Sequence, residues 1–261
     1  MKVVVCSKYI PDPNLPMTVD PERKRLVRDP AQSILDPGDE FGIEAALKLV
    51  EEHGGEVVVV SMGPEAADTA IRRAMAMGVE RAILVTDPGL EGSDALTTAQ
   101  VLSRVVATEE PDVVICATES TDAYTGMVPG AMAAMLDFPQ LTFVRSIQVE
   151  GSTITVQRDY ENGYQSVKAE LPVLITVTAS IAEPRYPSFK GMMQAKKKPI
   201  DTRDLGAIGL DAGQAGQAGA RERVLEIRKV EIDKQTRVIE DDGAGSSVDE
   251  IVNYLKQVQV I

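Results

Sequence analysis

The chain has 261 residues, which is long enough for one large or two small domains with a buried core. Apolar residues make up 44% of it and charged residues 26%, as in ordinary globular proteins, and the net charge of −13 opposes nonspecific binding to nucleic acid because phosphates would be repelled. No stretch approaches twenty uninterrupted apolar residues, so we expect a protein that does not span a membrane. The short apolar run near the N-terminus is too brief for a signal peptide.

The first part of the chain predicts strands that alternate with helices. Its strand-like runs are apolar throughout, which is typical of strands covered on both faces. Strand–helix alternation at this spacing favours parallel pairing with right-handed crossovers, so we predict an α/β fold with a doubly wound, mostly parallel sheet. The predicted strands are residues 2–7, 56–61, 82–86 and 112–117, and the predicted helices are residues 36–53, 66–77, 93–108, capped by Ser93, and 127–136.

Two regions interrupt this alternation. Residues 9–16 contain three prolines and residues 19–35 are polar, with several arginines, so we predict a surface hairpin or an excursion that embraces a second subunit. Farther along the chain we predict successive strands with no helices between them, over residues 141–149, 153–159, 164–170 and 173–178. These strands form either an antiparallel β extension grafted onto the core or a completion of its sheet.

The C-terminal part changes character again. Residues 204–220 carry a glycine every three or four positions, which predicts a linker. An extended arm over residues 222–239 and an amphipathic helix over 247–258, with Ser247 and Glu250 as a capping box, are predicted to follow. We therefore expect residues 1–200 to form the α/β domain and 201–261 a linker, arm and helix. The arm and helix either wrap a partner subunit or pack on their own domain.

The sequence predicts no catalytic residue and no metal ligand. His53 is the single histidine, which excludes a Ser/His/Asp relay and a histidine-rich metal site. Cys6 and Cys116 lie in apolar strand-like runs far apart in sequence, which indicates buried thiols and a cytoplasmic location rather than a zinc site. Neither a P-loop nor a glycine-rich dinucleotide motif after the first strand is present.

One predicted edge of the sheet is suited to a nucleotide. The fourth strand runs into a hydroxyl-rich turn and then a helix start, which suits a phosphate, although such turns also occur simply as helix caps. The loops after strands one, two and four meet near the topological switch point. Because residues 118–127 hold no Lys or Arg, a monophosphate fits better than a triphosphate. The predicted site consists of Cys6, Asp36, Pro37, Gly38, Asp39, Met62, Ala117, Thr118, Glu119, Ser120, Thr121, Asp122, Ala123, Tyr124 and Thr125.

Residues 183–198, E-P-R-Y-P-S-F-K-G-M-M-Q-A-K-K-K, form a second distinctive stretch. Two prolines predict an extended entry, followed by a helix over 190–197 that ends in lysines, where the helix dipole favours cations. Phe189 lies at the junction. It is either a staple that packs the loop onto the helix or an exposed anchor for a protein partner.

This stretch is very similar to the signature segment of electron transfer flavoprotein beta subunits, and the chain resembles that family from the first strand to about Ile208. The resemblance implies an electron carrier subunit, not an enzyme. It implies that residues 183–198 are a recognition loop that docks dehydrogenases through Phe189, and we expect Tyr186 and Lys190 beside it to contribute. It also implies AMP with a structural role at the predicted site, and FAD held mainly by an alpha subunit. Electrons would pass from acyl-CoA dehydrogenase-type donors to a quinone oxidoreductase.

Two alternatives stay open at this point. A bifurcating branch of the same family holds a second, redox-active FAD in place of AMP. The same α/β core also occurs in free-standing nucleotide-binding sensors and enzymes, which would need no partner subunit.

Overall fold

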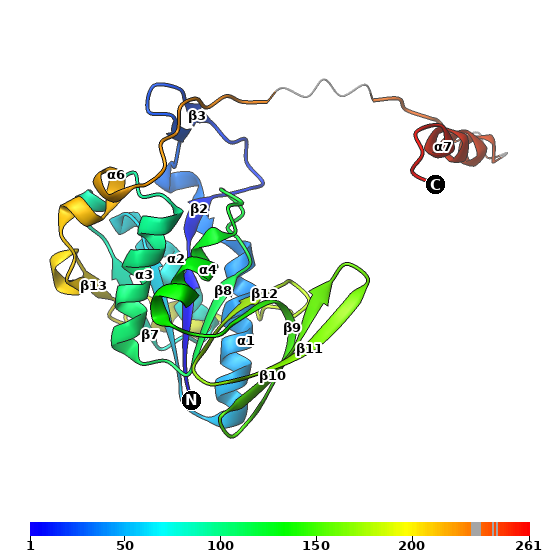
Figure 1. Ribbon diagram of the computed structural model, residues 1–261. Helices are drawn as coiled ribbons and strands as arrows, with labels where there is room; N and C mark the ends of the chain where they lie inside the picture. Colours follow the sequence, from blue (N-terminus) through cyan, green and yellow to red (C-terminus); the bar gives the residue numbers. More distant parts are fainter. Residues whose placement is uncertain (231–235, 242, 244) are drawn as a thin grey trace. The chain divides into compact units, whose positions relative to one another are not determined.

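A computed structural model describes residues 1–230, 236–241, 243 and 245–261. The chain forms two compact units, Met1–Ile227 and Arg228–Ile261 (Figure 1). The first unit carries the sheet and its helices, and it contains both stretches that the sequence singled out.

The first unit is built on one nine-stranded sheet with the order β11-β10-β9-β12-β8-β1-β6-β7-β13. In this spatial order, every neighbouring pair from β9 through β12, β8, β1, β6 and β7 to β13 is parallel. Only β10 is antiparallel to its neighbours, β9 and β11. The prediction of a doubly wound, mostly parallel α/β sheet is confirmed. The strands are β1 (Lys2–Ser7), β6 (Glu56–Met62), β7 (Arg81–Val85), β8 (Val113–Ala117), β9 (Gln140–Glu150), β10 (Thr153–Tyr160), β11 (Gly163–Glu170), β12 (Val173–Val177) and β13 (Asp201–Arg203).

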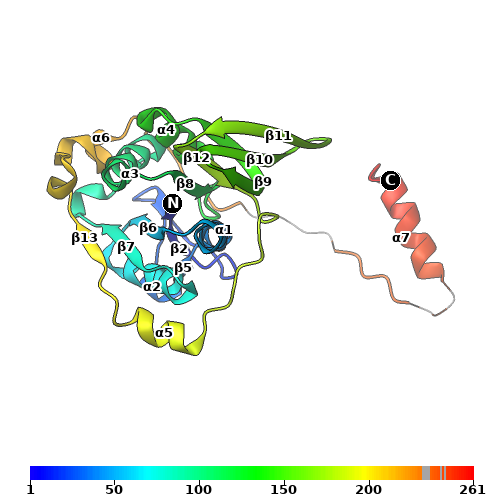
Figure 2. The ribbon, with the colours of Figure 1, turned by 90° about the horizontal axis from the view of Figure 1, so that it is seen from below.

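Helices cover both faces of this sheet, as the uninterrupted apolar strands predict (Figure 2). Along β1, Val3 and Val5 join one apolar cluster, while Val4 and Cys6 join the other. α1 (Pro37–His53) and α2 (Asp68–Met77) pack on the first cluster, and α3 (Ala95–Glu109) and α4 (Met127–Leu136) pack on the second. The core is therefore two apolar layers with the sheet between them.

The cap of α3 differs from the prediction. The residue that caps it is Asp94, whose carboxylate accepts the Thr97 N–H at 2.8 Å. Ser93 instead donates its hydroxyl to the Leu90 carbonyl at 2.8 Å. The helix begins one residue later than the serine cap requires, because Asp94 has the extended backbone that a cap needs and an oxygen that reaches Thr97.

The strands after α4 complete the sheet and do not form a separate layer. All five residues of β12 are buried, and this strand lies in parallel between β8 and β9. β11 is mostly exposed and takes the edge. Burial decides this order: a strand that is apolar on both faces is stable only in the middle of a covered sheet.

The region between β1 and α1 is a surface excursion, as predicted. β2 (Tyr9–Pro11) pairs antiparallel with β5 (Ser33–Leu35) at its base. β3 (Val19–Asp20) and β4 (Arg25–Leu26) form a small hairpin farther out. Four basic residues lie in or beside this hairpin: Arg23, Lys24, Arg25 and Arg28.

The glycine-rich segment is not a linker. β13 adds to the sheet beside β7, and the apolar side chains that follow, Leu205, Ile208 and Leu210, are buried in the α3 and α4 layer. Residues Gly216–Gly219 form a short turn of helix, α6. Its Gly216 has φ +57 and approaches the Gly89 carbonyl so closely that a Cβ would lie 2.1 Å from it. The glycines allow the chain to lie close against the domain, while three large apolar residues supply enough burial to hold it there.

The described residues of unit Arg228–Ile261 include the helix α7 (Ser246–Gln257), whose bounds lie within one residue of the predicted ones. The predicted capping box is wrong: Gly245 is the N-cap, at φ +85, and Ser247 donates to Asp241 while Glu250 pairs with Arg237. The predicted arm falls partly on residues 231–235, which lie outside the described residues; its described parts hold neither helix nor strand. Among the residues that the structure describes, no helix is long and apolar enough to cross a membrane.

Candidate functional site

The strand order reverses at the boundary between β1 and β8. From β1 the sheet continues through β6 and β7 on one side, and through β8 and β12 on the other. Ligands of open α/β sheets bind beyond the carboxyl ends of the strands at such a boundary. The loops that leave β1 and β8 here are those that the sequence predicted to form the site.

Asp36 fastens the loop after β8 to the start of α1. Its carboxylate is fully buried and caps α1 by accepting the Gly38 N–H at 2.9 Å. It also accepts the Thr121 N–H at 2.8 Å and the Thr121 hydroxyl at 3.0 Å. A Cβ on Gly38 would lie 3.4 Å from the Ala117 Cβ, so the two segments are in contact. These two predicted parts of the site are thus brought together.

Two cations that the sequence analysis missed complete this contact. Lys8 Nζ lies 2.6 Å from Asp122 Oδ1 and donates to the Ser120 hydroxyl at 3.2 Å. Arg28 Nη2 donates to Asp122 Oδ2 at 2.7 Å. The Asp122 side chain is fully buried. Burial would raise the pKa of Asp122, but the charge and hydrogen bonds of Lys8 and Arg28 outweigh it and lower that pKa.

Lys8 could have been found, because it directly follows the first strand at the edge where the site was expected. Arg28 could not, because only the tertiary path of the excursion brings it from a basic stretch to Asp122. The loop after β8 has no Lys or Arg between Thr118 and Met127, but two cations from other segments reach its Asp122.

Asp39 lies in the first turn of α1 and contacts the backbone of Lys8. Its carboxylate is buried and accepts the Lys8 N–H at 2.7 Å. Burial, and then the nearby charge of Asp36, raise the pKa of Asp39 well above its usual value, against the opposing effect of Lys8. Asp39 therefore helps to fix the β1 loop, and its environment favours the neutral acid.

Cys6 and Cys116 occupy neighbouring positions on β1 and β8 and are both buried as free thiols, as predicted. The hydrogen bond with Cys6, and then burial, raise the pKa of the Cys116 thiol well above its usual value. A thiol of raised pKa is a poor nucleophile. Both belong to the apolar cluster on the α3 and α4 side of the sheet, near the carboxyl ends of β1 and β8.

The end of the β8 loop presents an uncapped helix terminus. α4 begins after Gly126, at φ +61, and no side chain caps it. Residues 123–127 are exposed, and Tyr124 is 63% exposed. Such a terminus offers backbone N–H groups and the positive end of the helix dipole to an anion. Met62 lies across β1 from this loop and packs partly on the α3 and α4 layer.

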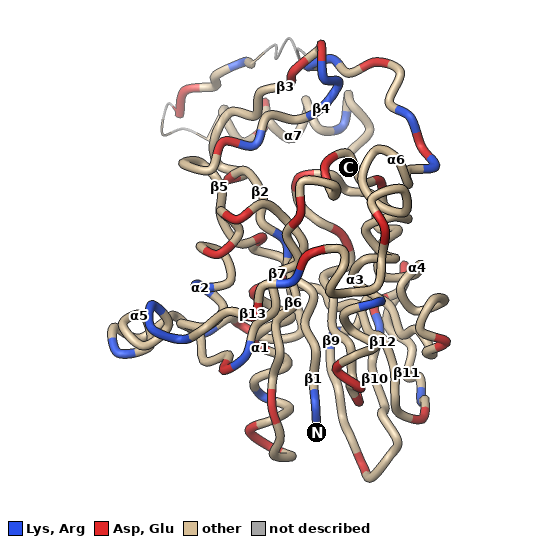
Figure 3. Tube along the Cα trace, turned by 90° about the vertical axis from the view of Figure 1, so that its left-hand side faces the viewer, with Lys and Arg blue, Asp and Glu red and all other residues tan. Residues whose placement is uncertain are grey.

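Residues 183–198, for which the resemblance predicts a recognition role and which we call the recognition segment, lie against α2. Its helix α5 (Phe189–Ala195) is capped by Ser188, whose hydroxyl accepts the Gly191 N–H at 3.0 Å. Tyr186 is 90% exposed and Phe189 is 78% exposed, and Lys190 is also exposed. This exposure excludes the staple interpretation of Phe189. Figure 3 shows basic residues along the segment, whose lysines are Lys190 and the run Lys196–Lys198 at its C-terminal end.

Comparison with known proteins gives these two surfaces a context. An electron transfer flavoprotein domain model matches residues 25–207. An electron transfer flavoprotein subunit beta from Mycobacterium leprae is 37% identical over 99% of both chains. Its namesakes from Thermoanaerobacterium thermosaccharolyticum and Megasphaera elsdenii are 36% identical over 86% of both chains and 33% identical over the full length of both.

The chain belongs to the electron transfer flavoprotein family. The family match includes the start of α1, the β8 loop and the whole recognition segment. It does not include Cys6 and Lys8, or the unit that contains α7, but the M. leprae and M. elsdenii beta subunits align over nearly all of the chain. The resemblance seen in the signature stretch is thus confirmed.

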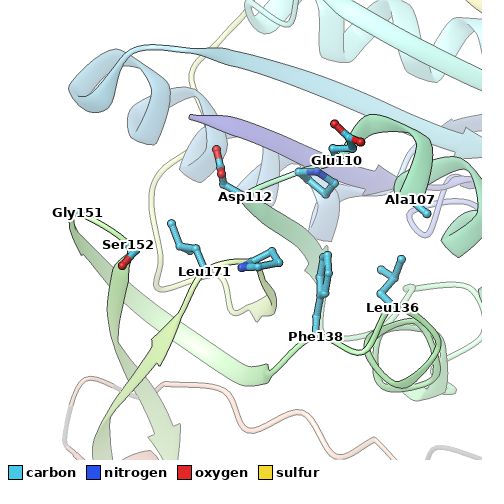
Figure 4. Close-up of a pocket in the computed structure, with 10 residues that line it drawn as sticks. Ala107, Glu110, Asp112, Leu136, Phe138, Gly151, Ser152 and Leu171 are labelled. Carbon is cyan, nitrogen blue, oxygen red and sulfur yellow. The ribbon is translucent and has the colours of Figure 1, made fainter.

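A groove of about 690 Å³ lies at the other end of the parallel strands, away from the loops described above (Figure 4). Leu136, Phe138 and Leu171 give it apolar walls, and Glu110 and Asp112 lie at its side. Because Asp112 immediately precedes β8, this groove opens at the amino ends of the strands and is separate from the predicted nucleotide site.

Proposed function

We propose that this chain is the beta subunit of a heterodimeric electron transfer flavoprotein. It binds AMP structurally and docks dehydrogenases, and electrons pass through an FAD held mainly by the alpha subunit towards a quinone oxidoreductase. The observation that carries the proposal is an exposed aromatic tip, Phe189, in a chain similar over its whole length to electron transfer flavoprotein beta subunits.

AMP in this chain is supported by the shape of the switch-point loops. The uncapped start of α4 suits one phosphate group, and the exposed residues Ala123, Tyr124 and Thr125 lie just before it. Lys8 and Arg28 add positive charge, although Asp122 neutralises part of it. In this proposal the loop residues bind and orient the nucleotide, and no side chain of the chain takes part in making or breaking bonds.

Association with an alpha subunit is supported by the C-terminal unit. Val248, Ile251 and Leu255 on α7, and Val258 at its C-cap, recur at helical spacing and form an apolar stripe. The unit Arg228–Ile261 is too short to bury this stripe with its own residues. In our proposal the stripe packs on the alpha subunit.

Acid extraction of the purified heterodimer tests the nucleotide assignment. We expect one FAD and one AMP for each heterodimer, identified by chromatography and mass spectrometry. Two FAD molecules and no AMP would favour the bifurcating alternative. ATP binding by the chain in isolation, with no need for a partner, would instead favour a free-standing sensor.

Replacing Phe189 by Ala tests the docking role. We expect unchanged flavin content and a catalytic efficiency of reduction by the donor dehydrogenase that falls roughly thirtyfold, as for a hot-spot side chain worth about 2 kcal/mol. Stopped-flow reduction of the flavin measures this rate. Tyr164→Ala is the matched control, because Tyr164 is an aromatic residue that is 60% exposed on the edge strand β11. An equal loss in both variants would contradict docking through Phe189.

A further inference from the structure

The recognition segment is exposed at its tip yet held at both ends. We infer that Arg185 and Arg72 are positioning residues that hold this segment in one conformation, so that Phe189 meets its partner preorganised. The inference rests on the docking role proposed for Phe189 and adds which residues determine how that side chain is presented.

Arg185 fixes the entry of the segment to α1. Its backbone N–H and Nε both donate to Glu44 Oε2, at 3.1 and 2.7 Å, and Nη2 donates to Glu44 Oε1 at 3.0 Å. Nη1 and Nη2 also donate to the two carboxylate oxygens of Glu51, at 2.6 and 3.1 Å. The guanidinium thus uses its planar fork on two carboxylates, a geometry that lysine cannot reproduce.

Glu44 makes this contact rigid. Its side chain is only 4% exposed, in the middle of α1, whereas Glu51 is 56% exposed. The hydrogen bonds to Glu44 and Glu51 raise the pKa of Arg185 further above its usual value, so it is charged at every relevant pH. A buried carboxylate on a core helix is a fixed point, since moving Arg185 away would remove all of these hydrogen bonds and leave it only the Lys48 ammonium, 4.0 Å away.

Arg72 fixes the exit of the segment to α2. Its Nη1 donates to the carbonyl oxygens of Ala195 and Lys198, at 2.5 and 2.8 Å. Nε and Nη2 are held by Asp68 on the same helix, at 3.1 and 3.0 Å. Arg72 therefore satisfies carbonyl groups at the end of α5 that the helix itself leaves unpaired.

Between these two contacts α5 lies directly on α2. A Cβ on Gly191 would come within 2.5 Å of the Ala76 carbonyl oxygen, and Ala195 is buried in the core. The segment thus has its ends and one face immobilised, while Tyr186 and Phe189 stay exposed. Because the segment is already ordered, it loses less conformational entropy when a partner binds Phe189 than a free loop would.

The first measurement is steady-state turnover of a donor dehydrogenase with the heterodimer as electron acceptor. For Arg185→Lys we expect KM for the heterodimer to rise on the order of tenfold, with kcat and flavin content unchanged. Arg145→Lys is the control, because Arg145 pairs with Asp159 on the β extension, away from the segment. It is expected to change neither constant.

A double-mutant cycle then tests whether Arg185 acts through Phe189. If it does, Arg185→Lys added to Phe189→Ala costs little more than Phe189→Ala alone. Fully additive losses would overturn the inference. Glu51→Gln, which changes only the exposed partner of Arg185, is a milder variant for the same cycle if Arg185→Lys does not fold.

The second measurement reports on the segment without any partner. A nitroxide at Lys190→Cys is expected to be more mobile by electron spin resonance when Arg185→Lys or Arg72→Lys is also present. Cys6 and Cys116 are buried and do not compete for the label. Unchanged mobility in both variants would overturn the inference. Mobility that rises while Phe189→Ala has no kinetic effect would keep the positioning role and refute the docking role.

Discussion

Asp122 joins three segments that are distant in the sequence. It lies in the loop after β8, and its buried carboxylate pairs with Lys8 from the end of β1 and with Arg28 from the excursion. These two ion pairs contribute more to stability than exposed salt bridges would, because the Asp122 side chain that they share has no contact with water. The loop after β8 is therefore held by two buried carboxylates, Asp122 and Asp36, the second through Thr121.

Replacing Asp122 by Asn is expected to lower the free energy of unfolding at neutral pH by about 1–3 kcal/mol, because Lys8 and Arg28 lose a charged acceptor. The pKa of Asp122 is depressed in the fold, so its contribution is complete above the unfolded pKa of about 3.9 and is lost as the pH falls through the lower folded value. Denaturant titrations should thus show wild type and variant converging in acid. Glu161→Gln, an exposed control, should run parallel to wild type; a parallel Asp122→Asn curve would contradict this role.

Asp94 has a comparable role at α3. It accepts hydrogen bonds from Thr97 and from the backbone N–H groups of Arg221 and Glu222, at 2.6 and 3.0 Å. Burial would raise the pKa of Asp94, but these hydrogen bonds outweigh it and lower that pKa to about 2. One side chain thus caps a helix and holds the backbone at Arg221 and Glu222, shortly before the end of the first unit.

We expect Asp94→Ala to destabilise the protein by about 0.5–2 kcal/mol and to speed amide hydrogen exchange at Arg221 and Glu222. Since the folded pKa is lower than the unfolded one, the difference from wild type should vanish as the pH falls from about 3.9 to about 2. Ser93→Ala is the comparison. Faster exchange at Thr97 in Ser93→Ala than in Asp94→Ala would mean that the serine is the cap after all.

At the scale of elements, α5 is a helix of 7 residues, too short to be stable in isolation. Its order comes from the contact with α2, where Gly191 allows backbone to approach backbone. Propensity alone would favour alanine over glycine there by about 1 kcal/mol. Intrinsic preference and packing therefore predict opposite effects of the same substitution.

We expect packing to prevail, so that Gly191→Ala displaces α5 and lowers the melting temperature. The clash is with a backbone carbonyl, at 2.5 Å, which cannot move aside as a flexible side chain would. Gly213→Ala is the control, because its Cβ would meet nothing within 4 Å. Thermal unfolding followed by circular dichroism decides the matter, and an unchanged or higher melting temperature for Gly191→Ala would show that α5 has room to adjust.

At the scale of the whole molecule, the two units differ in what they can do alone. Met1–Ile227 holds both apolar layers of the core, and the described part of Arg228–Ile261 includes the amphipathic helix α7. Ending the chain after Ile227 should therefore leave cooperative unfolding with a similar midpoint, and should weaken association with the alpha subunit. Sedimentation of mixtures measures that association. A large drop in the midpoint would indicate that α7 packs on its own domain.

Local signals in the sequence were sufficient to predict much of the first unit. Continuous apolar runs predicted β1, β6, β7 and β8, and the predicted helices 36–53 and 66–77 match α1 and α2 to within two residues. They also predicted where the loops of the candidate site would meet, because the ends of parallel strands share one edge. These features depend on neighbouring residues, so the sequence alone determined them.

Contacts between distant residues were decided only by the tertiary structure. The position of β12 between β8 and β9, the approach of Arg28 to Asp122, and the packing of residues 205–215 on the α3 layer each join segments that no local pattern links. The same is true of Arg185 on Glu44. The physical reason is common to all four: burial and charge pairing are satisfied by whichever partner the folded chain brings near, and that choice depends on the whole arrangement and not on sequence spacing.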